Sequence, residues 1–378
     1  MLNGDEDHIP GRGRSAVPRR GGTAVIGIGV VGCNYGRTVL VPAFRTEARC
    51  EVVALAGTDA ARTAELARAA DVARGFGDWR TLVDDRAVAA VAIAVPPELQ
   101  PEIAQRALDL GKPVFAEKPL AVDLAGAQAM LASARRCGRP TAVDFNFPEL
   151  ASWRRAKTML EGGTLGRLRH VVVTWNVENH ATRARIRSWK THGDGARGLL
   201  GNFACHCLYY LEWFCGPISG LGGRMFSLPG SDADASIALA IAFASGAGGS
   251  LQMSCASFLG SGHRIEFYGE DGTLVLANPT ADYFRGFVLT QARRGNKALQ
   301  PVAVEDFGAE AIPDPRIVPV SRLVNRFIGA CLDGGDPAPG FAEGYRVQCL
   351  LDAARRAHCC GRWIDIPPPA AAGGEEHR

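Results

Sequence analysis

The spacing of hydrophobic and polar positions changes near residue 147. Before that point, short apolar runs alternate with segments whose apolar residues recur at helical spacing. The apolar runs are 24–31, 51–56, 88–95, 113–116 and 141–145, and the helical segments are 60–72, 98–110 and 123–136. Such alternation is typical of βαβ units that build a parallel sheet. Residues 22–146 are therefore predicted to form an α/β domain.

The second part of the chain has longer strand-like runs, such as LRHVVVTWNV and ASIALAIAFA, separated by turn signals such as Glu270-Asp271-Gly272. Helices are predicted near its two ends. Their ranges are 149–160, 319–333 and 343–357. The pattern predicts that residues 147–367 form a C-terminal α+β domain built on a mainly antiparallel open sheet. Residues 1–21 and 368–378 are predicted to be flexible tails.

Composition narrows the class of protein. Hydrophobic residues make up 47% of the 378 residues, charged residues make up 21%, and the net charge is +3. This balance is typical of globular proteins and indicates neither a nucleic-acid partner nor a membrane surface. The 11 cysteines are scattered without a CxxC pair, which favours reduced thiols and a cytoplasmic protein.

Two short motifs imitate other functions. Arg19-Arg20 precedes an apolar segment, as in an export signal, but glycines interrupt that segment and no A-x-A cleavage site follows. Cys205-His206-Cys207 resembles a metal cluster. Consecutive residues of a helix point to different sides, so no metal site is predicted there.

The stretch AVIGIGVVGCNYGR contains two overlapping glycine patterns, which start at Gly27 and Gly32. A dinucleotide-binding loop must follow the first strand and open the first helix. The pattern at Gly27 leaves a strand of only four residues, whereas the pattern at Gly32 allows a full strand through Val31. We therefore prefer the second pattern. The residues expected at the cofactor are Gly32, Asn34, Tyr35 and Gly36.

The residues of this loop have separate expected roles. Gly32 makes the tight turn, and Gly36 allows the helix to pack closely on the sheet. Asn34 lets the backbone approach a pyrophosphate, because asparagine tolerates left-handed dihedral angles. A structural glycine turn in a domain without a nucleotide remains the alternative.

The end of the second strand bears on the choice of cofactor. NAD enzymes place an acid there that binds the ribose, whereas this chain has Gly57. Without a carboxylate, a 2′-phosphate meets no repulsion, Thr58 can donate to it, and Arg62 lies one helical turn further on. The site favours NADP, and Asp59 leaves NAD open.

Three blocks of sequence carry a family resemblance. In chain order they are IGVVGCNYGR, PPELQPEIAQRALDLGKPVFAEKPLAVD and GLLGNFACHCLYYLEWFCG. With these blocks in order and at suitable spacing, residues 23–366 resemble the Gfo/Idh/MocA oxidoreductases. The resemblance implies a Rossmann domain that binds NAD or NADP, and a C-terminal domain that covers it. It also implies a substrate among sugars, cyclitols and sugar nucleotides.

The motif Glu117-Lys118-Pro119 is the most specific part of the resemblance. A lysine at a strand end in the ligand crevice can hydrogen-bond the substrate oxygen and stabilise alkoxide charge. Pro119 removes a backbone donor and fixes the turn, and the family pattern implies a cis peptide bond before it. Glu117 is expected to orient the lysine or a ribose, although a surface salt-bridge pair is the alternative.

The same block places two further residues near the cofactor. Pro96 and Gln100 are expected to lie beside it. The family usually has histidine at the position of Gln100. Glutamine keeps the hydrogen bonding but does not titrate, so we expect it to be structural or cofactor-proximal rather than catalytic.

The third block resembles the family's catalytic helix, which brings an acid and a histidine to the substrate four residues apart. Here the matching positions are Asn202 and His206, and this spacing puts both on one helical face. His206 can act as an acid or base near neutral pH, whereas Asn202 can only hydrogen-bond. The proton relay of the family is therefore in doubt, and His206 can instead be a hydrogen-bonded core histidine.

Residues 178–198 read as a basic loop before this helix, suited either to phosphate or carboxylate binding or simply to solvation. Lys190 is the best single substrate-binding candidate, and Asn146 and Glu149 are weaker ones. In SIALAIAFA, large apolar residues alternate with alanines, which predicts a flat apolar sheet face suited to a second copy of the chain. A homodimer or homotetramer is predicted.

Together these features predict an NAD(P)-dependent oxidoreductase that transfers hydride between nicotinamide and a carbinol or ketone carbon. Lys118 and His206 would handle the oxygen and its proton, with Asn202 as a positioning group. Two alternatives remain open. One is a cofactor-binding regulator or scaffold without catalysis, and the other is a lyase or glycosidase that recycles its nicotinamide in place.

Overall fold

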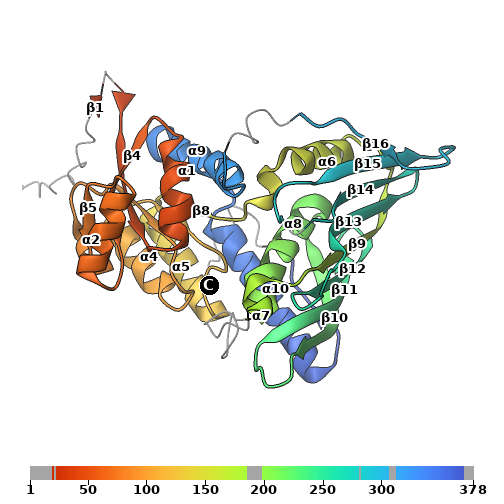
Figure 1. Cartoon of the computed structure of the whole chain (residues 1–378). Coiled ribbons are helices and arrows are strands. Elements are labelled where there is room, and N and C mark those ends of the chain that lie inside the picture. Colours follow the sequence, from red (N-terminus) through yellow and green to blue (C-terminus); the bar gives the residue numbers. More distant parts are fainter. Residues whose placement is uncertain (1–18, 21–22, 185–197, 281, 306–311, 370–378) are drawn as a thin grey trace, which may run out of the picture.

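The computed structural model contains two β-sheets on opposite sides of the molecule, with helices between them (Figure 1). The described residues are 19–20, 23–184, 198–280, 282–305 and 312–369. The last strand of the first sheet ends at Val143 and the first strand of the second sheet begins at Leu168. The boundary predicted at residue 146 thus falls between the two sheets.

The first sheet is parallel, with the strand order β5-β4-β3-β6-β7-β8. The strands are β3 (Ile26–Val31), β4 (Cys50–Ala56), β5 (Arg74–Phe76), β6 (Ala90–Ile93), β7 (Val114–Ala116) and β8 (Thr141–Val143). Every residue of β3 is buried, because helices cover both faces of a parallel sheet. The order is that of a Rossmann dinucleotide-binding fold, which confirms the predicted N-terminal domain.

The helices of this domain are η1 (Gly36–Leu40, a π-helical turn), α1 (Val41–Arg45), α2 (Ala60–Ala69), α3 (Trp79–Asp84), α4 (Gln100–Asp109) and α5 (Leu124–Cys137). Aspartates begin three of them. The side chains of Asp59, Asp78 and Asp123 each accept a backbone N–H of the first turn. The sequence pattern did not predict β5 and α3, because both are short and β5 has no apolar run.

A short antiparallel ribbon precedes the first sheet. It pairs β1 (Arg19–Arg20) with β2 (Thr23–Ala24). The sequence pattern had assigned Arg19-Arg20 to the N-terminal tail.

The second sheet has the order β16-β15-β14-β13-β9-β12-β11-β10-β17, and only the β9–β12 pair is parallel. Its strands are β9 (Leu168–Asn176), β10 (Ile218–Ser227), β11 (Asp234–Phe243), β12 (Gly248–Ser254), β13 (Gly262–Gly269), β14 (Gly272–Asn278), β15 (Val288–Arg293), β16 (Gln300–Pro301) and β17 (Ile364–Asp365). The expected mainly antiparallel sheet is confirmed.

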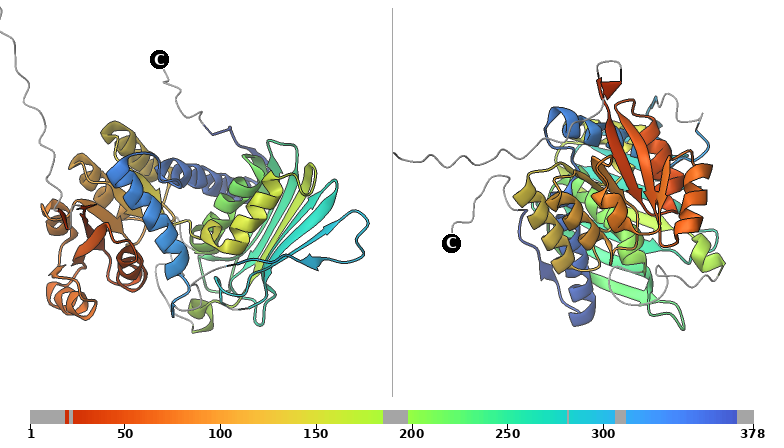
Figure 2. Two further views of the ribbon diagram at one scale, coloured as in Figure 1. Left: turned by 90° about the horizontal axis from the view of Figure 1, so that it is seen from above. Right: turned by 90° about the vertical axis from the view of Figure 1, so that its left-hand side faces the viewer.

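The remaining helices are η2 (Phe147–Glu149, a 3₁₀ turn), α6 (Ala151–Glu161), α7 (His180–Arg183), η3 (Leu200–Ala204, a π-helical turn), α8 (Cys205–Cys215), α9 (Ile317–Asp333) and α10 (Phe341–Cys360). Helices α6, α8 and α10 lie on the side of the second sheet that faces the first domain (Figures 1 and 2). In the part of the chain that is described, no helix covers the opposite side of this sheet (Figure 2).

Helix α9 comes late in the chain but packs in the core of the first domain. The rings of Phe44, Phe115 and Phe327 meet edge to face, with centroids 5.8 to 6.5 Å apart. Val320, Leu323, Val324 and Ile328 of α9 are buried in the same cluster. The chain therefore crosses between the domains more often than a single boundary implies.

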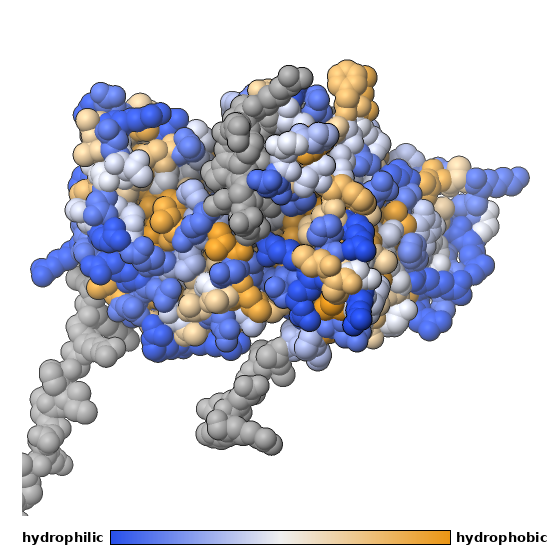
Figure 3. Space-filling model, turned by 90° about the horizontal axis from the view of Figure 1, so that it is seen from below, coloured by the Kyte–Doolittle hydropathy of each residue, from blue (hydrophilic) through white to orange (hydrophobic). Residues whose placement is uncertain are grey.

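Strand β11 shows the predicted alternation. Ile237 and Leu239 are buried, whereas Ala238 and Ala240 are exposed on the face that carries no helix. On the side of the molecule seen in Figure 3, hydrophobic residues form separate patches in a largely hydrophilic surface. No helix in the described residues is long and apolar enough to cross a membrane.

Candidate active site

The predicted cofactor residues gather at one edge of the first sheet. Gly32, Gly57, Pro96 and Glu117 each follow a strand of this sheet, namely β3, β4, β6 and β7. The carboxyl ends of parallel strands lie along one edge, where ligands of this fold class bind. The residues separated by up to 85 positions in the sequence are thus brought to one crevice.

The glycine turn has the expected geometry at Gly32 and Gly36, whereas Asn34 does not adopt the left-handed conformation considered for it. Strand β3 runs through Val31, and Gly32 has a φ of +121°. A Cβ at Gly32 would lie 2.1 Å from the carbonyl oxygen of Ala94, so only glycine fits. A Cβ at Gly36 would lie 2.9 Å from Val30 Cγ1, so this glycine lets the helix approach the sheet.

The end of β4 is closed to an acidic side chain. A Cβ at Gly57 would lie 2.6 Å from both Cys33 Sγ and Thr63 Oγ1. Asp59, which follows, accepts the backbone N–H of Arg62 at 2.8 Å and caps α2. Thr58, Asp59 and Arg62 are all exposed. This carboxylate therefore already has a structural role at the helix start.

Lys118 joins the two domains. The peptide bond from Lys118 to Pro119 is cis, as the resemblance implied. Lys118 Nζ donates a hydrogen bond of 3.0 Å to the backbone oxygen of Asn202. Gln100 is fully buried and its Nε2 donates to the oxygen of Pro119 at 2.8 Å. Gln100 thus supports the turn that aims Lys118.

The helix that carries Asn202 and His206 begins with the π-helical turn η3. In a π turn the backbone hydrogen bonds skip one residue further than in an α-helix, which disturbs the regular ladder of carbonyls. Asn202 therefore contacts Lys118 through its backbone oxygen. The sequence suggested a role for the Asn202 side chain, and no residue pattern indicated the role of its carbonyl.

His206 lies inside an aromatic surround. Its exposed fraction is 7%, and the rings of Phe145 and Phe147 meet it edge to face. Burial lowers the pKa of His206 well below its usual value, and the neighbouring Lys118 and His263 lower it further. The imidazole is thus neutral at physiological pH, and the shift opposes its protonation.

His263 lies behind His206 and was not singled out from the sequence. It stacks on Trp175 with centroids 4.2 Å apart, and its Nε2 lies 2.9 Å from Tyr210 Oη. Burial lowers the pKa of His263 to about 3. A histidine in a strand between glycine and arginine gives no sequence signal of such a position.

A buried cluster with two carboxyl groups lies next to the glycine turn. Tyr35 Oη donates to Asp144 Oδ2 at 2.9 Å, and Asp144 is 1% exposed. Burial raises the pKa of Asp144, against hydrogen bonds from Glu117 and Tyr35 that lower it. Burial also raises the pKa of Tyr35 well above its usual value, with a further contribution from Asp144. The sequence feature that could have singled out Asp144 is its position directly after an apolar strand.

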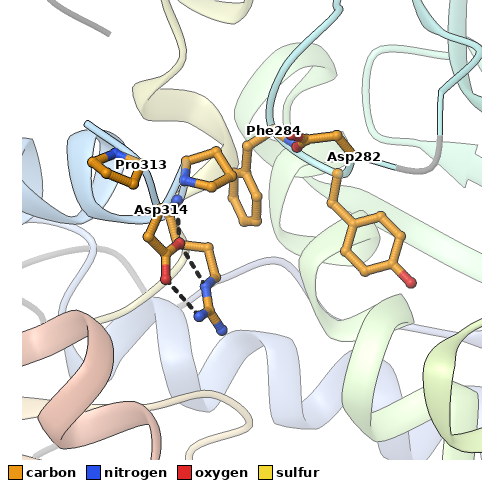
Figure 4. A pocket seen from close by; sticks show the side chains of 7 residues that line it. Asp282, Phe284, Pro313 and Asp314 are labelled. Atoms are coloured by element: carbon orange, nitrogen blue, oxygen red, sulfur yellow. Dashed lines mark hydrogen bonds and ion pairs between the residues drawn. The ribbon is translucent and has the colours of Figure 1, made fainter. Parts of the chain in front are cut away.

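A cavity of about 540 Å³ opens beside this cluster. It lies between the loop after β14, with Asp282, Tyr283 and Phe284, and the segment 313–316 that leads into α9 (Figure 4). Arg316 is held by two hydrogen bonds from its guanidinium to Asp314. Its guanidinium carbon lies 5.5 Å from the centre of the Tyr35 ring. Arg316 thus connects one wall of the cavity to Tyr35 of the glycine loop.

The substrate candidates have different outcomes. Lys190 lies outside the described residues. Asn146 is 3% exposed, and its Oδ1 accepts no hydrogen bond from the described residues. Glu149 is buried in ion pairs with Arg154 and Arg326. Glu149 therefore has a structural role, in place of the substrate contact that we considered.

The residues at this edge fit a nicotinamide dinucleotide. The tight turn at Gly32 follows β3 at the edge where parallel sheets bind dinucleotides, and it packs against the backbone of Ala94. Asn146 Oδ1 and His206 Nδ1 are buried polar atoms without a hydrogen-bond partner among the described residues. Such atoms favour a bound molecule that satisfies them.

Two family models match the chain. Residues 26–145 match the Gfo/Idh/MocA oxidoreductase family with an NAD-binding Rossmann fold, and residues 153–275 match the Gfo/Idh/MocA C-terminal domain. With the fold and the edge residues described above, the chain belongs to the Gfo/Idh/MocA family of oxidoreductases. The resemblance predicted from the three sequence blocks is confirmed.

Several characterised and uncharacterised relatives extend this finding. An uncharacterized oxidoreductase of Synechocystis sp. is 28% identical over 90% of this chain and 96% of the relative. Levoglucosan dehydrogenase of Pseudarthrobacter phenanthrenivorans is 27% identical over 80% of this chain and 88% of the relative. A solved structure of levoglucosan dehydrogenase in complex with NADH has a TM-score of 0.81 and covers 91% of this chain and all of that one, at 24% identity. That structural likeness supports the fold.

The buried histidines make stability depend on pH. The folded-state pKa of His263 is about 3, whereas an unfolded histidine titrates near 6.5. Between these values the unfolded chain binds more protons, so the free energy of unfolding falls as the pH falls. From pH 7 to pH 5, the free energy of unfolding should fall by about 2 kcal/mol less in His263→Gln than in the parent protein.

Urea denaturation at the two pH values measures this difference. The matched control is His170→Gln, which replaces an exposed histidine of β9. An equal loss of stability in His263→Gln and the parent protein would show that His263 does not stay neutral in the fold.

Proposed function

We propose that the protein is an NAD(P)-dependent oxidoreductase that transfers hydride between nicotinamide and a carbinol or ketone carbon of a sugar, a cyclitol or a sugar nucleotide. The observation that carries the proposal is the position of Lys118. It follows strand β7 at the ligand edge of a Rossmann sheet, and it contacts the helix that presents His206. The family membership and the names of relatives, such as levoglucosan dehydrogenase, support the same reaction class.

A bound nicotinamide supplies or accepts the hydride. Lys118 hydrogen-bonds the substrate oxygen, and as an ammonium it stabilises negative charge that develops there. Burial and the nearby Lys118 charge lower the pKa of His206 and keep it neutral. Its Nδ1 has no hydrogen-bond partner among the described residues, so it can hydrogen-bond the substrate hydroxyl and exchange its proton during hydride transfer. Asn202 holds Lys118 in place through its backbone oxygen.

The cavity lined by residues 282–284 and 313–316 does not include Lys118 or His206, so it is proposed as a subsite for the part of the substrate away from the reacting carbon. Tyr283 and Phe284 supply aromatic surface, and Asp282, Asp314 and Arg316 supply polar groups. Apolar surface with a few placed polar groups is typical of small-molecule sites. The ion pair with Asp314 compensates the positive charge of Arg316, which favours an uncharged sugar or cyclitol at this end.

A second candidate function rests on Asn202. An amide cannot exchange a proton as the acid of the family's catalytic helix does, so a cofactor-binding regulator or scaffold is the alternative. A panel of substrates separates the two proposals, because a regulator binds the cofactor without turning it over. A cytoplasmic location remains a prediction from the cysteine usage.

Turnover should depend on Lys118. We expect oxidation or reduction of the nicotinamide, followed by its absorbance, with at least one compound from a panel of anhydrosugars, free sugars, inositols and nucleotide sugars. Lys118→Met should lower kcat/KM by at least about 10²-fold, because the developing oxyanion loses its charged donor. Cofactor affinity should change by less than about threefold.

The exposed Lys297 gives a matched control, Lys297→Met, which should keep full turnover. Tight cofactor binding without turnover of any compound would instead favour the regulator. Asn202→Asp is then the informative variant, since it restores the acid of the family helix.

We further propose that NADP is preferred over NAD. Gly57 leaves no room for a ribose-binding acid, and Asp59 is engaged as a helix cap. Arg62 is exposed in the first turn of α2, where it can pair with a 2′-phosphate. The family description and the NADH complex of levoglucosan dehydrogenase name NAD, so NAD remains the alternative.

Arg62 should therefore discriminate between the two cofactors. We expect Arg62→Gln to weaken NADPH binding about tenfold and to leave NADH binding unchanged, because only NADPH carries the 2′-phosphate. Quenching of intrinsic fluorescence gives both dissociation constants. Arg68→Gln, further along the same helix and also exposed, is the control. Tighter binding of NADH than NADPH by the parent protein would contradict the preference.

We also propose a homodimer or homotetramer formed through the open face of the second sheet. Ala238 and Ala240 are exposed in the middle of this face, and Trp363 lies over Gly220 and Gly222 beside them. Small side chains leave a flat surface that suits contact between two sheets.

Size-exclusion chromatography with light scattering at micromolar concentration measures the assembly. We expect two or four chains in the parent protein and a shift toward one chain in Ala240→Glu, because the buried charge opposes contact. Ala125→Glu, on the exposed side of α5, should leave the assembly intact. A parent protein that elutes as a monomer would exclude this assembly.

A further inference from the structure

Two carboxyl groups lie side by side at the ligand edge of the first sheet. Ala116 of β7 and Val143 of β8 are register partners, and the next residues along the two strands are Glu117 and Asp144. The backbone N–H of Asp144 donates to the oxygen of Ala116 at 2.9 Å, so the strands are still paired at this point. Neighbouring strands are about 5 Å apart, which puts the two side chains within contact distance.

The surroundings of Asp144 leave one oxygen for the other acid. Tyr35 Oη donates to Asp144 Oδ2. The Asn146 side chain also hydrogen-bonds to the Asp144 carboxyl group, and Asp144 Oδ1 is buried. The Glu117 side chain is hydrogen-bonded to Asp144. Two carboxyl groups can hydrogen-bond to each other only when one of them carries a proton.

The charged and titratable groups around the pair come from several elements. Tyr35 belongs to the glycine loop, Lys118 follows Glu117, and Arg316 begins α9. The charges of Glu117 and Lys118 also act on the Cys205 thiol of α8. Two like charges at this separation in a buried site repel strongly, so the pair favours the state with a single charge.

We propose that Asp144 and Glu117 share one proton and act as a single carboxyl–carboxylate pair that supplies the negative charge missing from position 202. The pair is a positioning device for Lys118. Its one negative charge faces the Lys118 ammonium from the sheet side, while the backbone oxygen of Asn202 contacts the ammonium from the helix side. The role of the pair in positioning Lys118 for catalysis rests on the function proposed above. The shared proton does not depend on that function.

The arrangement explains how the chain can carry an amide where the family helix has an acid. A charged acid at position 202, added to the carboxylate of the pair, would give two negative charges around one ammonium. Asn202 keeps the helix carbonyl in place and adds no charge. In this chain the electrostatic partner of Lys118 is thus at the ends of β7 and β8 and not at position 202 in η3.

Infrared difference spectroscopy of the purified protein, without cofactor or substrate, tests the shared proton. At pH 7 a protonated carboxylic acid gives a carbonyl band that ionised carboxylates lack. We expect one such band to disappear in Asp144→Asn and equally in Glu117→Gln, because neither acid keeps the proton alone beside Lys118 and Arg316. Asp234→Asn identifies any band from the other buried aspartate, and Asp109→Asn is an exposed control.

The outcomes are distinct. Absence of a band that depends on Asp144 would show that both groups are ionised and would overturn the proposal. A band that is lost in Asp144→Asn and kept in Glu117→Gln would show a lone neutral acid, which also overturns it. Circular dichroism and thermal unfolding confirm that each variant is folded, and the two variants provide independent measurements.

Kinetics then test the link to Lys118 with the best compound of the substrate panel. We expect each single variant to lower kcat about tenfold or more, with cofactor affinity and KM within about threefold. The double variant should be no worse than either single one, because residues that act as one unit are not additive. Additive losses would contradict a shared role, and absence of turnover in the parent protein would count against the proposed function alone, since the spectra do not depend on it.

Discussion

The hydrogen bond from Lys118 Nζ to the backbone oxygen of Asn202 is the contact on which the site depends. One partner ends a strand of the Rossmann sheet, and the other belongs to the π-helical turn before α8. The bond therefore exists only when the two halves of the molecule are packed in one arrangement. The turn at Pro119, supported by Gln100, aims the lysine at that carbonyl.

Burial sets the chemistry around this contact. His206 and His263 are enclosed by aromatic rings, which removes water and keeps both imidazoles neutral. Asp144 is equally buried but has Tyr35 as a donor. The site thus places Lys118 and Arg316 among neutral groups and a small number of acids. Each charge acts strongly there because solvent screens it little.

The sequence predicted much of this site where local rules decide the structure. The tight turn at Gly32 and the close packing at Gly36 follow from the length of the first strand and from sterics. The same reasoning placed Lys118 at a strand end, since strand ends in a parallel sheet share one edge. Arg316 could not be found in this way, because it reaches Tyr35 only through the packing of α9 on the first domain.

The sequence by itself determined the two sheets, their classes and the residues of the glycine turn, because hydrophobic periodicity and the steric demands of glycine act over a few neighbouring positions. Only the tertiary structure decided that the Asn202 carbonyl, rather than its side chain, meets Lys118. It also decided that Glu149 joins a structural ion pair and that Asp144 meets Tyr35. These outcomes depend on contacts between residues far apart in the chain, and no local pattern encodes them.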